Sequence, residues 1–219
     1  MYVGIDVGHE RIHAVRVDNE THLVDAGVFD ALDPAAVVAW SGDARVVAID
    51  APAARSTRPH SCDPPSRRSA KFAPARCAEI HLGEAFGIWV PWVAPCQGDD
   101  CPGWMTVGFA LFAAFSAAGT RAIETYPHGA FRVLAGRTEK LLPKRTRRGA
   151  ARRVELLRAA GLDERHLDLW SHDSLDAAVA AIVARDHAAR RAQEAGCGHD
   201  GSRIWLPATA DQTTDSKPL

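Results

Sequence analysis

The sequence predicts an α/β fold in which helices cover a mixed β-sheet on both faces. Residues 2–7, 11–17 and 22–29 are short, β-branched stretches joined by tight polar links, as in an antiparallel meander. Residues 45–50, RVVAID, form a continuous apolar run, which is typical of a parallel strand buried on both faces. A helix between the meander and this run indicates a crossover, so the sheet combines antiparallel and parallel strands.

The other elements are predicted from the signals at their ends. Asp33 and Pro34 are an N-cap and first-turn pair that begins a helix through Trp40, and Gly42 ends that helix. Further elements are expected in this order: a helix after Pro74, a helix over 104–119, a strand over 121–127, a short helix to about Gly136, a helix ending near Gly161, a helix from about Asp173 to Gly196, and an edge strand over 203–207.

We expect one domain over residues 1–207 and a disordered polar tail over residues 208–219. The formal net charge of −1 means that any binding of a polyanion depends on a local patch. No apolar run is long enough to span a membrane and no signal peptide begins the chain, so a cytoplasmic location is predicted. Five cysteines without a C-x-x-C pair indicate reduced thiols.

Residues 9–13, HERIH, contain the H-E-x-x-H pattern of zinc proteases. The pattern binds zinc on a helix, where residues four apart lie about 5 to 6 Å from each other on one face. His13 falls in the predicted strand 11–17, and four residues of a strand span about 13 Å. The pattern is therefore interpreted as a chance match.

Five acidic residues stand where predicted strands end or where the last long helix begins. Asp6 and Asp50 end apolar strands, Glu124 lies in the strand AIETYP, and Asp173 and Asp176 begin the helix. Strand ends at one edge of a sheet converge on one crevice, and a spacing of three places two residues on one helix face. We therefore predict that these five carboxylates are catalytic residues of a single site.

Carboxylates gathered in this way repel one another unless a cation neutralises them. Hard divalent cations prefer oxygen ligands, so two Mg²⁺ or Mn²⁺ ions are predicted, with Asp6, Asp50, Asp173 and Asp176 as metal ligands. Two such ions about 4 Å apart activate water and stabilise the leaving oxygen of a phosphodiester. The alternative is structural: Asp50 as a turn former, and Asp173 and Asp176 as the cap and first-turn residues of a helix.

The segment of residues 137–153 is strongly basic and precedes a predicted helix. Such a cluster suits contacts to a phosphate backbone, although basic runs also occur as solvated surfaces. The residues predicted to bind nucleic acid are Lys140, Lys144, Arg145, Arg147, Arg148 and Arg152.

Five motifs occur in order from residue 2 to about residue 185: YVGIDVG, VVAIDAPA, SCDPPSRR, IETYPHGAF and HDSLDAAVAAIVA. Together they resemble a bacterial and archaeal domain-of-unknown-function family of predicted nucleases with a ribonuclease H-like fold. IETYPHGAF and DSLDAAVAAIVA are the specific parts, whereas GIDVG occurs in many proteins. DSLDAAVAA is also similar to the closing helix of bacterial Holliday-junction resolvases, in which two aspartates three residues apart complete a two-metal site.

The resemblance implies a ribonuclease H-like sheet and gives each carboxylate a role. Asp6 would bridge both metal ions, and Asp50 would be the ligand from the second strand. Asp176, together with Asp173, would hold the other side of the metal pair, and Glu124 would be an additional acidic group.

The resemblance also bears on the roles of His172 and Arg58. His172, directly before the last helix, would orient an attacking water, whereas a histidine at such a boundary is more often a surface residue. Family members carry an Arg-rich R-x-C-D element, but STRPHSCD spaces Arg58 and Cys62 differently. No role is therefore transferred to Arg58.

The predicted function is that of a hydrolase: a metal-dependent nuclease that cleaves phosphodiester bonds of DNA or RNA by a two-metal-ion mechanism. The turn of residues 6–8, DVG, supports an alternative, a nucleotide-binding fragment of an actin-like or sugar-kinase-like ATPase. Those proteins need a duplicated domain, for which 219 residues leave no room in one chain. A non-catalytic nucleic-acid-binding module is the third interpretation, and the sequence leaves a homodimer open.

Overall fold

The computed structural model describes residues 1–55, 75–90, 101–136, 138–196 and 199–209. Its main sheet has five strands in the order β3-β2-β1-β4-β5. The first three strands pair antiparallel, whereas β4 is parallel to both β1 and β5. The predicted α/β class and ribonuclease H-like mixed sheet are therefore confirmed. The bounds of the strands are β1 (Tyr2–Val7), β2 (Arg11–Val17), β3 (Leu23–Asp30), β4 (Val46–Asp50) and β5 (Ala122–Glu124).

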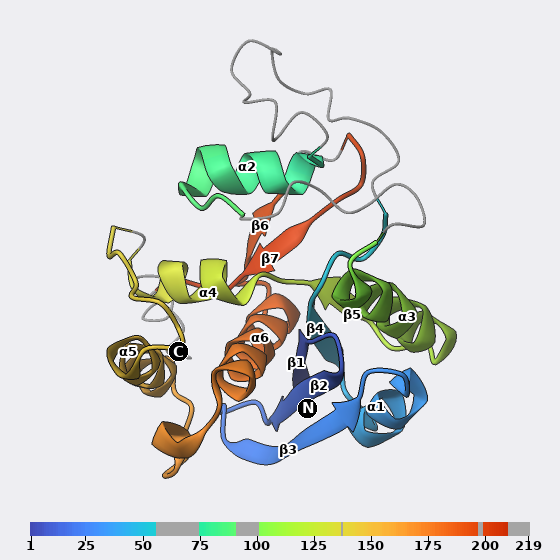
Figure 1. Cartoon of the computed structure of the whole chain (residues 1–219), viewed down its shortest axis with the longest axis horizontal. Coiled ribbons are helices and arrows are strands. Elements are labelled where there is room, and N and C mark those ends of the chain that lie inside the picture. Colours follow the sequence, from blue (N-terminus) through green and yellow to red (C-terminus); the bar gives the residue numbers. More distant parts are fainter. Residues whose placement is uncertain (56–74, 91–100, 137, 197–198, 210–219) are drawn as a thin grey trace, which may run out of the picture.

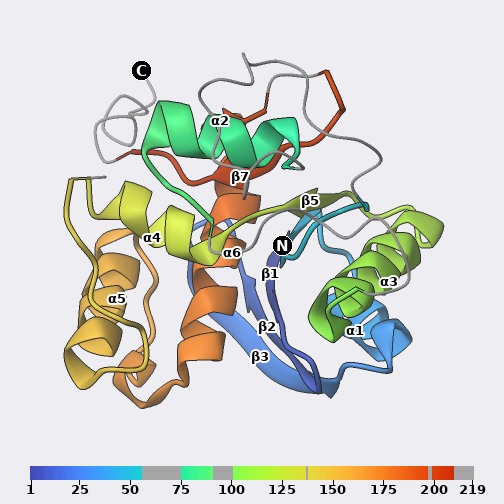
Figure 2. The ribbon, with the colours of Figure 1, turned by 45° about the horizontal axis from the view of Figure 1, so that its top comes forward.

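Helices cover both faces of this sheet, as Figures 1 and 2 show. On one face α6 packs against the central strands, with α4 and α5 outside it, and on the other face lie α1 and α3. A separate hairpin of β6 and β7 packs with α2 beyond β5. The bounds are α1 (Pro34–Ser41), α2 (Cys77–Phe86), α3 (Gly103–Ala117), α4 (Pro127–Leu134), α5 (Arg147–Ala159), the 3-10 turn η3 (Leu167–Leu169), α6 (His172–Ala188), β6 (Gln193–Ala195) and β7 (Ile204–Leu206).

The central contact of the fold is between β1 and α6. Every residue from Ala177 to Ala184 is fully buried, so this helix is apolar on all sides, as a helix enclosed by other elements must be. Gly4 of β1 lies directly beneath it: a Cβ atom there would be 2.1 Å from both Ala177 O and Ala181 N. The absence of a side chain at Gly4 therefore lets strand and helix backbones touch.

Local signals gave the bounds of several elements correctly. Strands β1 and β2 occupy the predicted residues, and α1 begins after Asp33, whose side chain accepts a hydrogen bond from Ala36 N. The predicted strand 121–127 is shorter, because Pro127 begins α4 instead of ending the strand. This position suits proline, since the first turn of a helix needs no amide donor.

The predicted end of the last helix at Gly196 is wrong. Helix α6 ends at Ala188, Arg190 adopts a positive φ of 59°, and residues 193–195 pair with β7. Residues 203–207 were predicted as an edge strand; β7 pairs with β6 and touches the main sheet through an isolated bridge between Thr125 and Trp205.

Three other expectations concern the C-terminal tail, the cysteines and membrane-spanning helices. Ala208 is buried and donates its amide to Asp186 Oδ2, whereas residues 210–219 of the predicted tail lie outside the described residues. Cys77 and Cys101 are disulfide-bonded, so the prediction of reduced thiols is wrong for these two residues, because spacing along a chain does not show which thiols meet. Among the described residues, no helix is both long and apolar enough to cross a membrane.

Candidate active site

The carboxylates of Asp6, Asp173 and Asp176 meet at one end of the sheet. One ligand atom of each lies within 4.8 Å of the other two. Asp6 is the second-last residue of β1, and Asp173 and Asp176 lie in the first two turns of α6. The close approach at Gly4 brings this end of α6 onto the strand, so the backbone packing sets the distance between the carboxylates.

Asp50 lies beside this group through the pairing of parallel strands. It is the residue of β4 opposite Asp6, so both side chains point to the face that α6 covers. The two carboxyl groups lie close enough for each to shift the pKa of the other. We define the carboxylate cluster as Asp6, Asp50, Asp173 and Asp176.

Burial makes the charged forms of these carboxyl groups costly. Desolvation and the neighbouring Asp176 raise the pKa of Asp6 to about 7. Desolvation and the charge of Asp6 hold the pKa of Asp50 well above its ordinary value, and desolvation also raises the pKa of Asp176. With all of its carboxyl groups ionised, the cluster would carry more negative charge than Lys144 compensates, and this favours a bound cation.

Among the described residues, Lys144 is the cation in contact with the carboxylate cluster. Its Nζ lies 2.5 Å from Asp176 Oδ2 and 3.6 Å from Asp173 Oδ1. These carboxylates raise the pKa of Lys144 despite its partial burial, so it is an ammonium ion. Lys144 was predicted to bind nucleic acid; in this structure it binds the carboxylates.

The cluster opens into a cavity of about 890 Å³. Arg11 and Arg145 contribute cationic groups to its lining, and Trp104 and Tyr126 contribute aromatic groups. Asp176 faces an adjoining cavity of about 470 Å³, which shares Asp50, Tyr126 and Lys144 with the first. The site is therefore accessible from two sides and combines carboxylates with basic walls.

His13 is a site residue that the sequence analysis did not find. The antiparallel pairing of β1 and β2 places it opposite Asp6, and its Nδ1 lies 3.2 Å from Ser174 Oγ on α6. It lines the larger cavity, whereas it was considered only as part of the H-E-x-x-H pattern. As expected, that pattern occupies a turn and a strand instead of a helix. His172 Nδ1 is 2.5 Å from Asp173 Oδ1 at the rim.

Glu124 lies apart from the carboxylate cluster. In the pairing of β4 and β5 it stands opposite Ile49, one residue before Asp50, so its side chain points to the other face of the sheet. There it is buried and accepts from Arg76 Nη1 at 3.0 Å, while Arg76 also binds Glu79. Glu124 Oε2 accepts a hydrogen bond from Ala53 N as well, at 2.9 Å, and so holds the backbone just after Asp50.

The residues predicted to bind nucleic acid divide into three groups. Lys140, Arg147 and Arg148 are exposed, and Arg145 is exposed at the lining of the larger cavity. Arg152 is bound to two carboxylates, Glu139 and Glu155, across the surface of α5. Lys144 binds the cluster, as described above.

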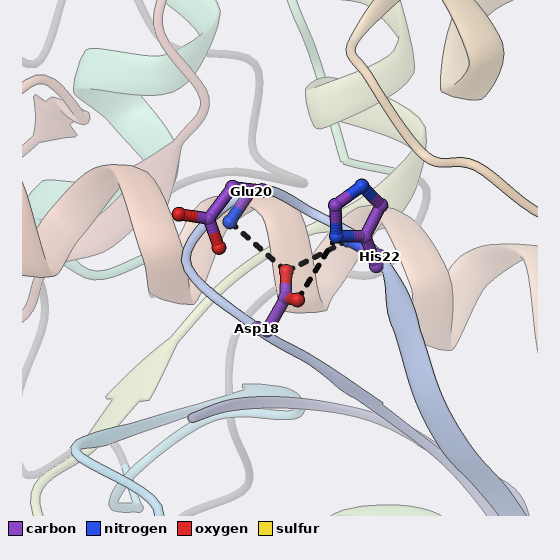
Figure 3. Close-up of side chains that lie close together, drawn as sticks. All are labelled: Asp18, Glu20 and His22. Carbon is purple, nitrogen blue, oxygen red and sulfur yellow. Dashed lines mark hydrogen bonds and ion pairs between the residues drawn. The ribbon is translucent and has the colours of Figure 1, made fainter.

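A second group of metal-ligand types occurs at the turn between β2 and β3, formed by Asp18, Glu20 and His22 (Figure 3). Asp18 Oδ1 accepts from the backbone amides of Glu20 and His22, and Asp18 Oδ2 lies 3.0 Å from His22 Nδ1. These contacts explain why the three side chains lie together: the Asp18 side chain stabilises the turn.

The fold and the carboxylate cluster define an α/β protein with a ribonuclease H-like sheet and an acidic site at the carboxyl ends of its parallel strands. Residues 106–197 match the family model described as "Protein of unknown function (DUF429)", which confirms the predicted resemblance to a domain-of-unknown-function family over this part of the chain. Among solved structures, "Thermus thermophilus RuvC structure" is similar to 86% of this chain and 95% of that chain, with 16% identity and a TM-score of 0.42. No curated protein matches the sequence.

Proposed function

We propose that the protein is a divalent-metal-dependent nuclease that hydrolyses phosphodiester bonds at the carboxylate cluster. The observation that carries the proposal is the meeting of three carboxylates from β1 and α6 within 4.8 Å, beside Asp50 and at the base of a cavity with arginines in its lining. Carboxylates for metal ions and arginines for a phosphodiester thus occur within one site.

The residues present fit a hard divalent cation. Ligand oxygens around Mg²⁺ at about 2.1 Å lie up to roughly 4.2 Å apart, so a carboxylate separation of at most 4.8 Å closes onto one ion with small side-chain movements. Every ligand atom in the cluster is a carboxylate oxygen, the donor that magnesium and manganese prefer. Burial raises the pKa of Asp6 and Asp176, and a bound cation would keep both ionised at neutral pH.

Asp6, Asp50, Asp173 and Asp176 would hold the cations. When bound, two such ions activate a water molecule and stabilise the leaving oxygen of a phosphodiester. Asp50, whose pKa burial and the charge of Asp6 raise, would give its proton to solvent in order to bind a cation. Lys144, which lines the same cavity, would be a partner for a phosphate oxygen.

The basic residues around the opening would hold the substrate. Arg11 and Arg145 line the cavity, and the exposed Arg147 and Arg148 lie at the start of α5, close in sequence to this wall. Guanidinium groups bind phosphates through paired hydrogen bonds and carry no sequence information by themselves. We therefore propose a nucleic acid as substrate, held by its backbone.

Glu124 would act as a positioning residue instead of a ligand. Its hydrogen bond from Ala53 N fixes the segment that follows Asp50. Burial raises the pKa of Glu124, and the ion pair with Arg76 opposes that rise. Glu124 would thus influence the reaction by fixing the orientation of Asp50.

The test is cleavage of labelled single-stranded, duplex and branched DNA and RNA with Mn²⁺ or Mg²⁺. Asp6→Asn removes a proposed ligand, and Asp18→Asn is the matched control, because it makes the same change at the exposed turn and keeps the Oδ1 acceptor. We expect cleavage by the wild type and by Asp18→Asn, and loss of cleavage in Asp6→Asn. Equal cleavage by both variants would remove the carboxylate cluster from the mechanism, and metal-dependent hydrolysis of ATP without cleavage would favour the nucleotide-binding alternative.

A further inference from the structure

A second cavity, of about 510 Å³, lies at the opposite end of the sheet from the carboxylate cluster. Arg45 directly precedes β4 and Arg121 directly precedes β5, so both stand at the amino ends of parallel strands. Five strand residues at about 3.3 Å each place Arg45 roughly 17 Å from Asp50. This cavity is thus separate from the proposed nuclease site, and its volume is in the range of small-molecule sites.

Three arginines surround this cavity. Arg190, which follows α6, joins Arg45 and Arg121 in its lining, together with His187 and Trp205. We define the arginine pocket as these five residues; β7, which bears Trp205, packs beside the end of α6 (Figure 1). The elements that form the pocket come from four separate parts of the chain, so the tertiary fold gathers the cationic groups.

No carboxylate from the described parts of the chain lines the arginine pocket. Its three guanidinium groups form no ion pair with the described residues, whereas neighbouring arginines do: Arg185 and Arg191 both bind Asp186, at 2.8 and 2.9 Å. Like charges held together around a concave surface raise the local positive potential, which attracts an anion. Because Asp186 pairs with Arg185 and Arg191, its charge is directed to those residues and not to the three arginines of the pocket.

His187 helps to hold Arg121 in the lining of the pocket. Its side chain is buried, with 9% exposure, and its Nε2 lies 3.4 Å from Arg121 Nη2. An arginine only donates, so Nε2 accepts and the neutral ring carries its proton on Nδ1. Burial and the Arg121 charge lower the pKa of His187, which keeps the ring neutral. Nδ1 is buried and has no hydrogen-bond partner among the described residues, so Nε2 is the ring nitrogen that contacts the pocket arginines.

We propose that the arginine pocket binds the phosphate group of a nucleotide or of a nucleic-acid strand. Guanidinium groups match phosphate oxygens in geometry and charge. Arg190 adopts a φ of 59°, a conformation rare outside glycine. Trp205 borders the cavity with an indole ring at 4.5 Å from the His187 ring, an aromatic surface suited to a base.

The experiment is calorimetric titration of the full chain in EDTA, which excludes metal-dependent binding at the carboxylate cluster. The probes are inorganic phosphate, a nucleoside monophosphate and a 5′-phosphorylated oligonucleotide. The double variant Arg121→Gln with Arg190→Gln removes two charges from the pocket, and Arg165→Gln is the control, because Arg165 is exposed and lies outside the pocket. His187→Phe keeps an aromatic ring beside Trp205 but removes the acceptor that holds Arg121.

We expect the wild type and Arg165→Gln to bind at least one phosphate-bearing probe, and the double variant to bind it at least tenfold more weakly. His187→Phe should weaken binding several-fold. Binding of the mononucleotide with loss in the double variant identifies a small ligand, and the same loss confined to the oligonucleotide identifies a nucleic-acid strand. Absence of binding by all three probes, or equal binding by the wild type and the double variant, would overturn the proposal. Because metal is absent, a failure here leaves the nuclease proposal untouched.

Discussion

Replacing Gly4 by alanine should disturb the carboxylate cluster without changing any of its residues. The added Cβ would lie 2.1 Å from Ala177 O and Ala181 N, about 1.3 Å short of the 3.4 Å at which ordinary contact begins. Both obstructing atoms belong to the α6 backbone, which cannot rotate away as a side chain can. Helix α6 must therefore retreat from β1 by about an ångström, and Asp176 must retreat with it.

The cost can be estimated from overpacking in other cores, which is typically about 1 to 3 kcal/mol and occasionally more. We expect about 3 kcal/mol for Gly4→Ala, because backbone obstructs backbone, and this lowers Tm by roughly 6 to 12 °C in a domain of this size. A displacement near 1 Å at a catalytic group reduces activity by about 100-fold. The variant should therefore lose both stability and metal-dependent cleavage.

Thermal unfolding in EDTA and Mn²⁺ titration measure the two effects separately. Gly27→Ala is the control, since its Cβ would meet the Phe29 ring at 2.8 Å, the movable end of a side chain. We expect Gly27→Ala to change Tm by less than about 4 °C. A Gly4→Ala variant with the Tm and the Mn²⁺ affinity of the wild type would refute the argument that the approach of α6 to β1 sets the site.

Three further predictions concern charged groups. Lys144→Met removes the ammonium group that competes for the carboxylates, so Mn²⁺ should bind about tenfold more tightly by calorimetry; weaker binding would show that the lysine assists the ion. Because burial raises the folded pKa of Asp6 from 3.8 to about 7, its protonated form stabilises the metal-free fold fully below pH 3.8, and this stabilisation is lost as pH rises through about 7. Denaturant titrations in EDTA should show this loss in the wild type and a smaller one in Asp6→Asn; parallel pH profiles would contradict it. Arg76→Met leaves the buried Glu79 and Glu124 without their cation and should cost about 3 to 5 kcal/mol in urea unfolding, whereas a cost under about 1 kcal/mol would show that water replaces the pairing.

The sequence predicted those parts of the fold that depend on local signals. Strands β1 and β2 follow from β-branched alternation, and α1 follows from Asp33, Pro34 and Gly42. The end of α6 could not be found in this way, because ARRAQEAG continues a helix-forming composition past Ala188. Its termination involves distant groups, since Asp186 accepts the amide of Ala208.

The site shows the same division between local and tertiary information. Asp6 and Asp50 could be placed together because both end parallel strands, but the position of Glu124 depends on a register that differs by one residue. His13 was within reach of the sequence: a hairpin closing at residues 8–10 places it opposite Asp6. Which basic residue turns inward, Lys144 in this structure, depends on how the segment before α5 lies over the cluster.

Equilibrium Mn²⁺ binding followed by electron paramagnetic resonance shows whether the carboxylate cluster holds divalent cations. We expect up to two ions per chain in the wild type and in Asp18→Asn, with affinity at least about 100-fold lower in Asp6→Asn, since charge-assisted contacts to the ions are lost. Circular dichroism should confirm that all three proteins are folded. Mn²⁺ binding of equal affinity in the wild type and in Asp6→Asn would contradict the claim.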